Sequence, residues 1–128
     1  MTEQEWGQIE HFKPDGTIDN FGDPYKMDFR LLWALDRLRD RIGKPFIVHC
    51  GYDTEGHLPN SLHKMGQAVD FHVKGIKVFD MAEILNVVWW FGGLGVYPHW
   101  NKPGFHIDIG PYRRWHKNKY GAYMSPDH

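Results

Sequence analysis

The sequence predicts an α+β domain in which a small antiparallel sheet carries helices on one face and an open polar cleft on the other. Two segments, residues 26–42 and 77–91, repeat apolar residues with the period of an amphipathic helix. Two strand-like segments, residues 68–73 and 105–109, alternate polar and apolar side chains. At 128 residues the chain is long enough for one domain, residues 1–128, with an arm (1–26), a core (27–115) and a tail (116–128).

The N-terminal half is expected to contain the arm, a helix and a strand. Turn-forming residues are frequent in residues 1–26, and we expect Trp6, Phe12 and Phe21 to anchor this arm. The helix at 26–42 buries a stripe of four side chains and is ended by Gly43; the stripe is Leu31, Leu35, Leu38 and Ile42. Residues 46–51 are apolar enough for a central strand.

The C-terminal half is expected to supply the remaining strands. Residues 52–66 are predicted to be a long loop, and loops of this length in small domains are commonly functional. The helix at 77–91 ends at the glycines 92–93, and strands follow at 94–97 and 105–109. The tail after Tyr112 has no clear period. Its basic cluster, residues 113–119, is interpreted as a solvated turn, with contact to an anionic glycan or a peptide carboxylate as the alternative.

Three residues form a candidate zinc site: His63, Asp70 and His106. Alternation places Asp70 on the same strand face as His72, and His106 on the same face as Asp108. A carboxylate that points inward needs a cation or a hydrogen-bond network, because burying it alone costs several kcal/mol. Two imidazoles and one carboxylate form a typical catalytic zinc set, which leaves the fourth position for water.

The motifs around these residues resemble a known family. Ser61-x-His63-x-x-Gly66-x-Ala68-x-Asp70, followed by Phe105-His106-Ile107-Asp108-Ile109-Gly110, is similar to the zinc D-Ala-D-Ala peptidases of the hedgehog/DD-peptidase fold group, which includes murein endopeptidases and phage endolysins. Gly51-Tyr52, the segment 93–98 and Trp115 extend the likeness to about residues 27–115. The resemblance implies a Zn²⁺ metallopeptidase that hydrolyses peptide bonds in peptidoglycan stem peptides or crosslinks.

The chain departs from this family at two positions that bear on catalysis. Asp53 stands where the family often has an arginine that binds the substrate's carboxylate, so we expect endopeptidase rather than D-Ala-D-Ala carboxypeptidase activity. Pro103 stands where well-studied members have an acidic general base. The base is therefore expected to be Asp108 or His99, and the alternative role for Asp108 is to orient a histidine ligand.

Two rival functions fit the same residues. One is a catalytically inactive, zinc-stabilised binding module of the same fold, which the two departures favour. The other is an interaction domain without metal, in which the histidines and aspartates form hydrogen bonds. Metal content separates the second rival from the others, and hydrolysis of murein separates the enzyme from the binding module.

Composition limits the partners and the location. The net charge of −1 gives no overall field for nucleic acid, no apolar stretch is long enough to insert into a membrane, and we expect a monomer. The polar start does not resemble a signal peptide, so we expect synthesis in the cytoplasm and action on the cell wall after release, as for a phage or prophage lysin, unless the sequence is part of a longer product.

The single cysteine and the aromatic residues allow two further predictions. Adjacent strand residues point to opposite faces, so His49 and Cys50 should not form a pair, and we expect Cys50 to be a buried, inert thiol. For the aromatic residues 89–91 and Trp100 a core role is favoured over sugar stacking.

Overall fold

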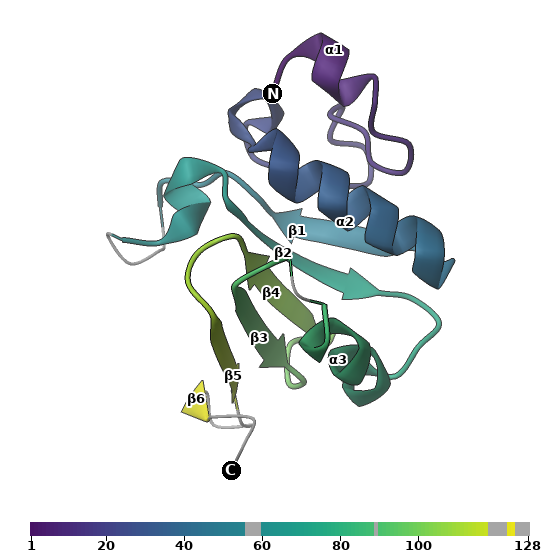
Figure 1. The fold of residues 1–128 in the computed structure, drawn as a ribbon, viewed down its shortest axis with the longest axis vertical. Helices are drawn as coiled ribbons and strands as arrows, with labels where there is room; N and C mark the ends of the chain where they lie inside the picture. The colour runs from purple at the N-terminus through teal and green to yellow at the C-terminus, as the bar shows by residue number, and fades with distance from the viewer. Residues whose placement is uncertain (56–59, 89, 118–122, 125–128) are drawn as a thin grey trace.

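The chain folds into a six-stranded sheet with helices packed against it. This computed structural model describes residues 1–55, 60–88, 90–117 and 123–124. The strand order is β1-β2-β4-β3-β5-β6, as Figure 1 shows from β1 behind the long helix to β6 near the C-terminus. The strands are β1 (Phe46–Cys50), β2 (Ala68–Val73), β3 (Gly93–Tyr97), β4 (Gly104–Asp108), β5 (Arg113–Lys117) and β6 (Tyr123–Met124).

The sheet confirms the predicted α+β class. Four of the five strand pairs are antiparallel. The exception is the parallel pair of β3 and β5, which the sequence analysis did not anticipate. The interpretation of the basic cluster as a turn was therefore wrong for residues 113–117, which form β5, while residues 118 and 119 lie outside the described part of the chain.

The two predicted helices are present but shorter, and three short helices were not predicted, one of them within the predicted loop 52–66. The helices are α1 (Glu3–Trp6), η1 (Pro24–Lys26), α2 (Phe29–Ile42), η2 (Leu62–Met65) and α3 (Val78–Asn86). The long helix α2 starts at the N-cap Asp28, because the residues before it form the separate turn η1. It ends at Gly43, whose φ of 71° is left-handed and therefore suits glycine. Among the described residues, no helix is long and apolar enough to cross a membrane.

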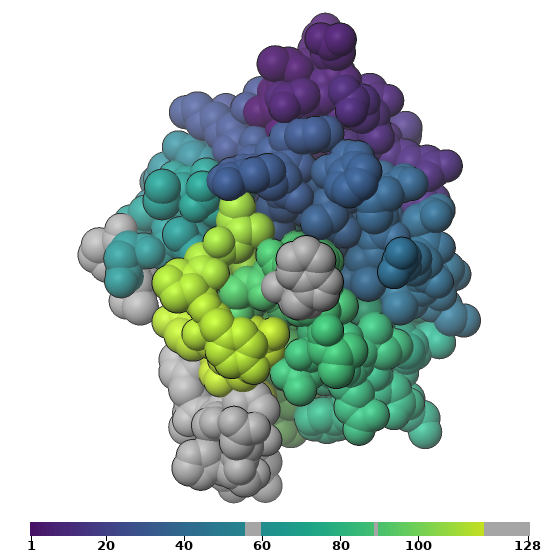
Figure 2. All heavy atoms as spheres, viewed as in Figure 1, coloured from purple at the N-terminus to yellow at the C-terminus, as the bar shows by residue number. Residues whose placement is uncertain are grey.

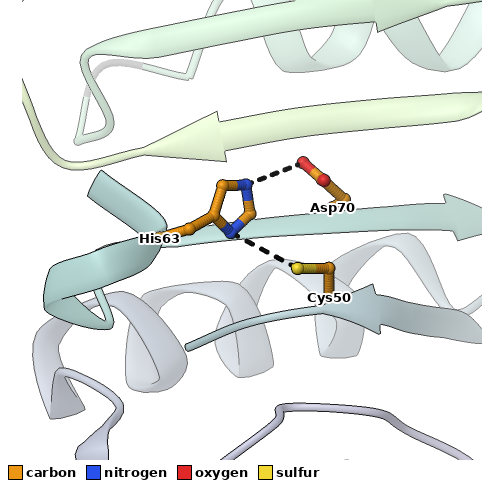
Figure 3. A group of neighbouring side chains, drawn as sticks. All are labelled: Cys50, His63 and Asp70. Atoms are coloured by element: carbon orange, nitrogen blue, oxygen red, sulfur yellow. Dashed lines mark hydrogen bonds and ion pairs between the residues drawn. The ribbon is translucent and has the colours of Figure 1, made fainter. Parts of the chain in front are cut away.

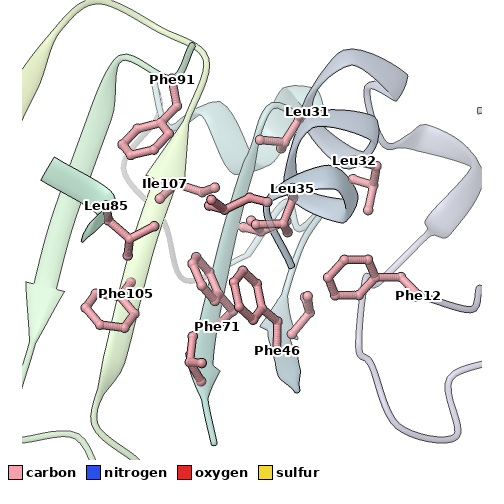
Figure 4. Close-up of a cluster of buried hydrophobic side chains, with 14 of the residues drawn as sticks. Phe12, Leu31, Leu32, Leu35, Phe46, Phe71, Leu85, Phe91, Phe105 and Ile107 are labelled. Carbon is pink, nitrogen blue, oxygen red and sulfur yellow. The ribbon is translucent and has the colours of Figure 1, made fainter. Parts of the chain in front are cut away.

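One apolar layer holds the helices to the sheet. Alternate strand residues Phe46, Phe71, Phe105 and Ile107 are at most 1% exposed and pack with Leu31 and Leu35 of α2 and Leu85 of α3 (Figure 4). Because strand side chains alternate, the residues between them point to the opposite face of the sheet. This is the face that carries His106 and Asp70.

The N-terminal arm is part of this core. Trp6, Phe12 and Phe21 are all at most 5% exposed, which confirms that they anchor the arm. The fully buried carboxylate of Asp36 in α2 accepts hydrogen bonds from the backbone N–H groups of Glu10 and His11. In the space-filling view the arm, in purple, lies directly against the blue surface of α2 (Figure 2).

Candidate metal centre

Backbone pairing brings a row of functional residues together across the sheet. Cys50 of β1 pairs with Asp70 of β2, and Asp70 pairs with His106 of β4. His106 in turn pairs with Gly95 of β3. Residues that pair directly across antiparallel strands have side chains on the same face. The row therefore brings Asp70 and His106 into contact, as strand alternation predicts.

His63 reaches the row from the short helix η2. Ser61 caps this helix, and Gly66 ends it with a left-handed φ of 67°. A Cβ at Gly66 would lie 2.0 Å from the carbonyl O of Lys26, so only glycine allows the chain to turn here into β2. This turn carries His63 over the sheet, where its side chain is buried.

Two imidazoles converge on one carboxylate oxygen. His63 Nε2 lies 3.3 Å from Asp70 Oδ1, and His106 Nδ1 lies 3.0 Å from the same oxygen. His63 Nδ1 lies 2.8 Å from the carbonyl O of Gly51, so this nitrogen carries a proton, and Nε2 is the nitrogen that faces Asp70. The sequence-predicted His63, Asp70 and His106 thus lie together, and their donor atoms suit zinc.

The electrostatics of the cluster favour an ionised carboxylate. Burial alone would raise the pKa of Asp70, but hydrogen bonds from His106 and His63 outweigh it and hold this pKa well below its usual range. Burial alone would lower the pKa of His63, but its contacts with Asp70 and Cys50 raise it to about 10. A fixed negative charge between two imidazoles is a suitable environment for a cation.

Asp108 holds His106 from the side opposite Asp70. One oxygen of its buried carboxylate lies 2.8 Å from His106 Nε2, and the other accepts hydrogen bonds from the N–H groups of Gly93 and Gly110. A Cβ at Gly93 would lie 2.2 Å from Asp108 Oδ2, so glycine makes room for the carboxylate. Asp108 is placed to orient the imidazole of His106.

Cys50 lies beside the cluster and is half-buried, so its prediction as a buried thiol was wrong. Its Sγ is 3.7 Å from His63 Nδ1, while Asp70 contacts the other ring nitrogen (Figure 3). Donor atoms of Cys50, His63 and Asp70 lie within 4.8 Å of one another and form a second set that could hold a metal ion. No local sequence pattern indicates this contact, because it depends on how the chain between β1 and η2 returns to the sheet.

A β-bulge explains why the alternation argument failed at His49 and Cys50. The register of β1 shifts between Val48 and Cys50, so His49 is an extra residue without a partner position on β2. The His49 side chain contacts His72 on the polar face, the same face on which Cys50 contacts His63. The two neighbours therefore share a face, but each has a different partner.

The remaining candidates lie further from the cluster. His99 is exposed in the turn after β3, and among the described residues no contact joins it to Asp70 or His106. Pro103 is exposed just before β4. Asp53 follows β1, and its backbone N–H donates to the carbonyl O of His63. Its Oδ2 lies 4.0 Å from Cys50 Sγ.

Aromatic rings enclose the other side of His106. The ring of Trp115 in β5 lies 5.3 Å from that of His106, and its Nε1 donates to the hydroxyl of Tyr97. A Cβ at Gly95 would lie 2.5 Å from the Trp115 ring, so this glycine lets the indole lie against β3. Of the aromatic residues predicted to lie in the core, Phe91 is buried, Trp90 is half-buried against the core, and residue 89 lies outside the described residues. The prediction was wrong for Trp100, which is half-buried and lines a surface pocket.

A partly buried His–Asp–His cluster on the open face of a mostly antiparallel sheet defines a domain of the metallopeptidase type. The chain belongs to the M15-type peptidase family whose model is described as peptidoglycan L,D-endopeptidase MepK, which matches residues 8–115. This finding confirms the family resemblance derived from the motifs around His63 and His106.

Individual relatives agree with the family model. The chain is 32% identical over 126 residues to the peptidoglycan L,D-endopeptidase MepK of Escherichia coli K12 and to that of Shigella flexneri, covering 88% of this chain and 66% of each relative. It is 33% identical over 108 residues to a probable MepK of Haemophilus influenzae, covering 71% of this chain and 55% of that protein. The chain thus spans 55–66% of the length of these relatives. No solved structure showed a significant match.

Proposed function

We propose that the protein is a zinc-dependent endopeptidase that hydrolyses peptide bonds in peptidoglycan stem peptides or crosslinks. The observation that carries the proposal is the convergence of His63 Nε2 and His106 Nδ1 on Asp70 Oδ1, at 3.3 and 3.0 Å. The substrate class is supported by the printed names of the relatives, which are peptidoglycan L,D-endopeptidases.

We assign the zinc ligands to His63, Asp70 and His106. Bound zinc supplies Lewis-acid chemistry, which polarises a scissile carbonyl and activates water near neutral pH. The protein's own groups fix the ligands: the carbonyl O of Gly51 accepts a hydrogen bond from Nδ1–H of His63, and Asp108 accepts one from Nε2–H of His106. Each imidazole then presents its remaining nitrogen toward Asp70.

Asp108 and His99 are the two predicted candidates for the group that transfers the proton. Asp108 already accepts from two backbone N–H groups and His106, so we propose that it positions His106 rather than acting as the base. His99 is exposed in the turn after β3 and is free to meet solvent or substrate. We therefore propose His99 as the group that carries the proton, a role that typically contributes 10²–10⁴-fold to the rate.

The bond cleaved is proposed to lie inside the peptide rather than at a free D-Ala-D-Ala end. Asp53, three residues after Cys50, places a carboxylate oxygen 4.0 Å from Cys50 Sγ, and this charge would repel a terminal carboxylate. Carboxypeptidase activity is accordingly expected to be weak. We propose that the protein acts on the bacterial cell wall, where this substrate lies. A role as a phage endolysin is a more specific proposal for the same place of action.

Hydrolysis of purified murein tests the proposal. We expect the zinc-loaded protein to release soluble muropeptides, and His63→Ala and His106→Ala to abolish the release; the control is His11→Ala, which removes a histidine that pairs with Asp40 far from the cluster. Murein binding without hydrolysis would instead support the inactive binding module, which Pro103 in the position of the family's acidic base favours.

A further inference from the structure

A cavity opens on the same face of the sheet as the candidate metal centre. Its volume is about 410 Å³, within the range of pockets that hold small ligands. Ile18 of the arm, residues 47–49 of β1, His72 of β2 and residues 100–102 of the loop before β4 line it. His72 is two residues from Asp70 on the same strand face, which corresponds to about 6.6 Å along the strand.

The polar groups of this pocket favour an anion. Lys102 supplies a permanent positive charge, while the amide of Asn101 and one imidazole of the His49–His72 pair supply hydrogen-bond donors. Among the described residues that line it, none is acidic. The ammonium of Lys102 would therefore repel a cationic ligand, whereas a carboxylate could form an ion pair with Lys102 and accept hydrogen bonds from the pocket.

The walls of the pocket are defined by contacts within the protein. Trp100 stacks on Tyr97 with ring centroids 4.2 Å apart, and it lies 6.2 Å from the ring of His49. The bulge in β1 turns His49 toward His72, and their ring nitrogens are in direct contact. One ring donates this hydrogen bond and the other accepts it, so the accepting ring carries its proton on its remaining nitrogen and can donate that N–H to a ligand.

We propose that this pocket is a substrate subsite that binds a carboxylate-bearing side chain of the stem peptide, one or two residues from the bond cleaved at the His63–Asp70–His106 cluster. The inference rests on the proposed function. The spacing between His72 and Asp70 matches the spacing of alternate residues in an extended peptide lying across the same face. Lys102 and His49 are the specificity-determining residues.

Binding of matched peptides tests this assignment. A murein stem tripeptide with free carboxylates and the same peptide with amidated carboxylates are titrated into the zinc-loaded protein, and the indole N–H resonance of Trp100, assigned with Trp100→Phe, reports on the pocket. We expect the free-carboxylate peptide to bind about two- to fivefold more tightly, as an exposed charge pair allows. Lys102→Met should remove this preference, and Lys102→Arg should retain it.

Two controls locate the effect. Lys77→Met removes an exposed lysine at the start of α3 and should leave the preference unchanged. Glutarate, a free dicarboxylate, should bind more weakly than the peptide; equal affinity would indicate a general small-anion pocket and overturn the assignment. Equal affinity for the two peptides, a preference that survives Lys102→Met, or binding that does not shift the Trp100 resonance would also overturn it.

Murein hydrolysis measured in parallel separates this inference from the proposed function. Hydrolysis without a carboxylate preference would leave the endopeptidase standing and reject the subsite. A Lys102-dependent preference without hydrolysis would retain the pocket as a peptide-binding site and reject the enzyme.

Discussion

The contacts of Asp108 suit a residue that positions His106 rather than one that transfers a proton. Its carboxylate bridges His106 to the N–H groups of Gly93 and Gly110, so Asp108→Asn should loosen the ring without removing a metal ligand. We expect zinc affinity to fall about 10- to 100-fold, as for other groups that orient a metal-bound histidine. Competition with a chromophoric chelator measures the affinity. Unchanged zinc affinity with lost turnover would instead identify Asp108 as the base.

Gly95 leads to a second prediction at the residue scale. A Cβ there would lie 2.5 Å from the Trp115 ring, so Gly95→Ala should force the indole away from β3 and away from His106. We expect a loss of about 1–3 kcal/mol in the free energy of unfolding, as for other overpacked sites. Urea unfolding measures it. In a Trp115→Ala background, Gly95→Ala should lower the free energy of unfolding much less. An equal loss in both backgrounds would show that the Trp115 ring is not what the added Cβ displaces.

The same residues show what sequence reasoning can resolve at this scale. Asp70 and His106 were placed on one face correctly, because alternation along a regular strand is local information. Cys50 was misplaced, because the bulge that turns it to the polar face depends on how β1 pairs with β2. The contact of Cys50 with His63 depends on a loop whose path no local pattern determines.

At the scale of elements, α2 depends on its N-cap. Asp28 accepts from the N–H of Arg30, and the side-chain bond from Arg30 is the largest of the causes that lower the pKa of Asp28 below 3.8. Asp28→Ala should therefore cost about 1 kcal/mol at pH 7. Because the pKa of Asp28 is lower in the folded protein than in the unfolded chain, ionised Asp28 stabilises the fold at pH values above the unfolded pKa. This stabilisation is lost as the pH falls through the folded pKa.

Urea unfolding at pH 7 and near pH 3 checks this sign. The difference between the wild type and Asp28→Ala should shrink at the lower pH, because protonated Asp28 loses its ion pair with Arg30. The control is Asp23→Ala, which removes the cap of the short η1 instead. A difference that grows on acidification would contradict the assignment.

Elements with a strong local pattern were predicted well, and those without one were not. The helices α2 and α3 carry apolar stripes, and Gly43 marks the end of the first, so their existence followed from the sequence. Strand β5 has the sequence Arg-Arg-Trp-His-Lys, which does not alternate polar and apolar residues. It forms because β3 offers a free edge for parallel pairing, and that edge exists only after the sheet has assembled.

At the scale of the whole molecule, the arm should be necessary for a stable fold. Phe12 is fully buried, its ring lies 6.2 Å from Phe21, and the guanidinium of Arg39 in α2 lies over it. Phe12→Ala should lower the free energy of unfolding by about 3–5 kcal/mol, the usual range for a large core truncation. Chemical denaturation measures this loss. Ile18→Ala in the same arm is the control, because Ile18 is 69% exposed and should cost little.

The proposed zinc site should also stabilise the whole fold. His63 comes from η2, Asp70 from β2 and His106 from β4, so an ion held by all three joins segments that unfolding would separate. A ligand that binds only the native state stabilises it by about 4 kcal/mol at a thousandfold excess over Kd. Chelation should therefore lower the Tm of the wild type, and zinc should restore it. In the presence of zinc, His63→Ala should have a lower Tm than the wild type, and the chelator should no longer change that Tm. The Tm of His11→Ala should fall on chelation as that of the wild type does. A chelator response that persists in both His63→Ala and His106→Ala would assign the stabilising ion to another site.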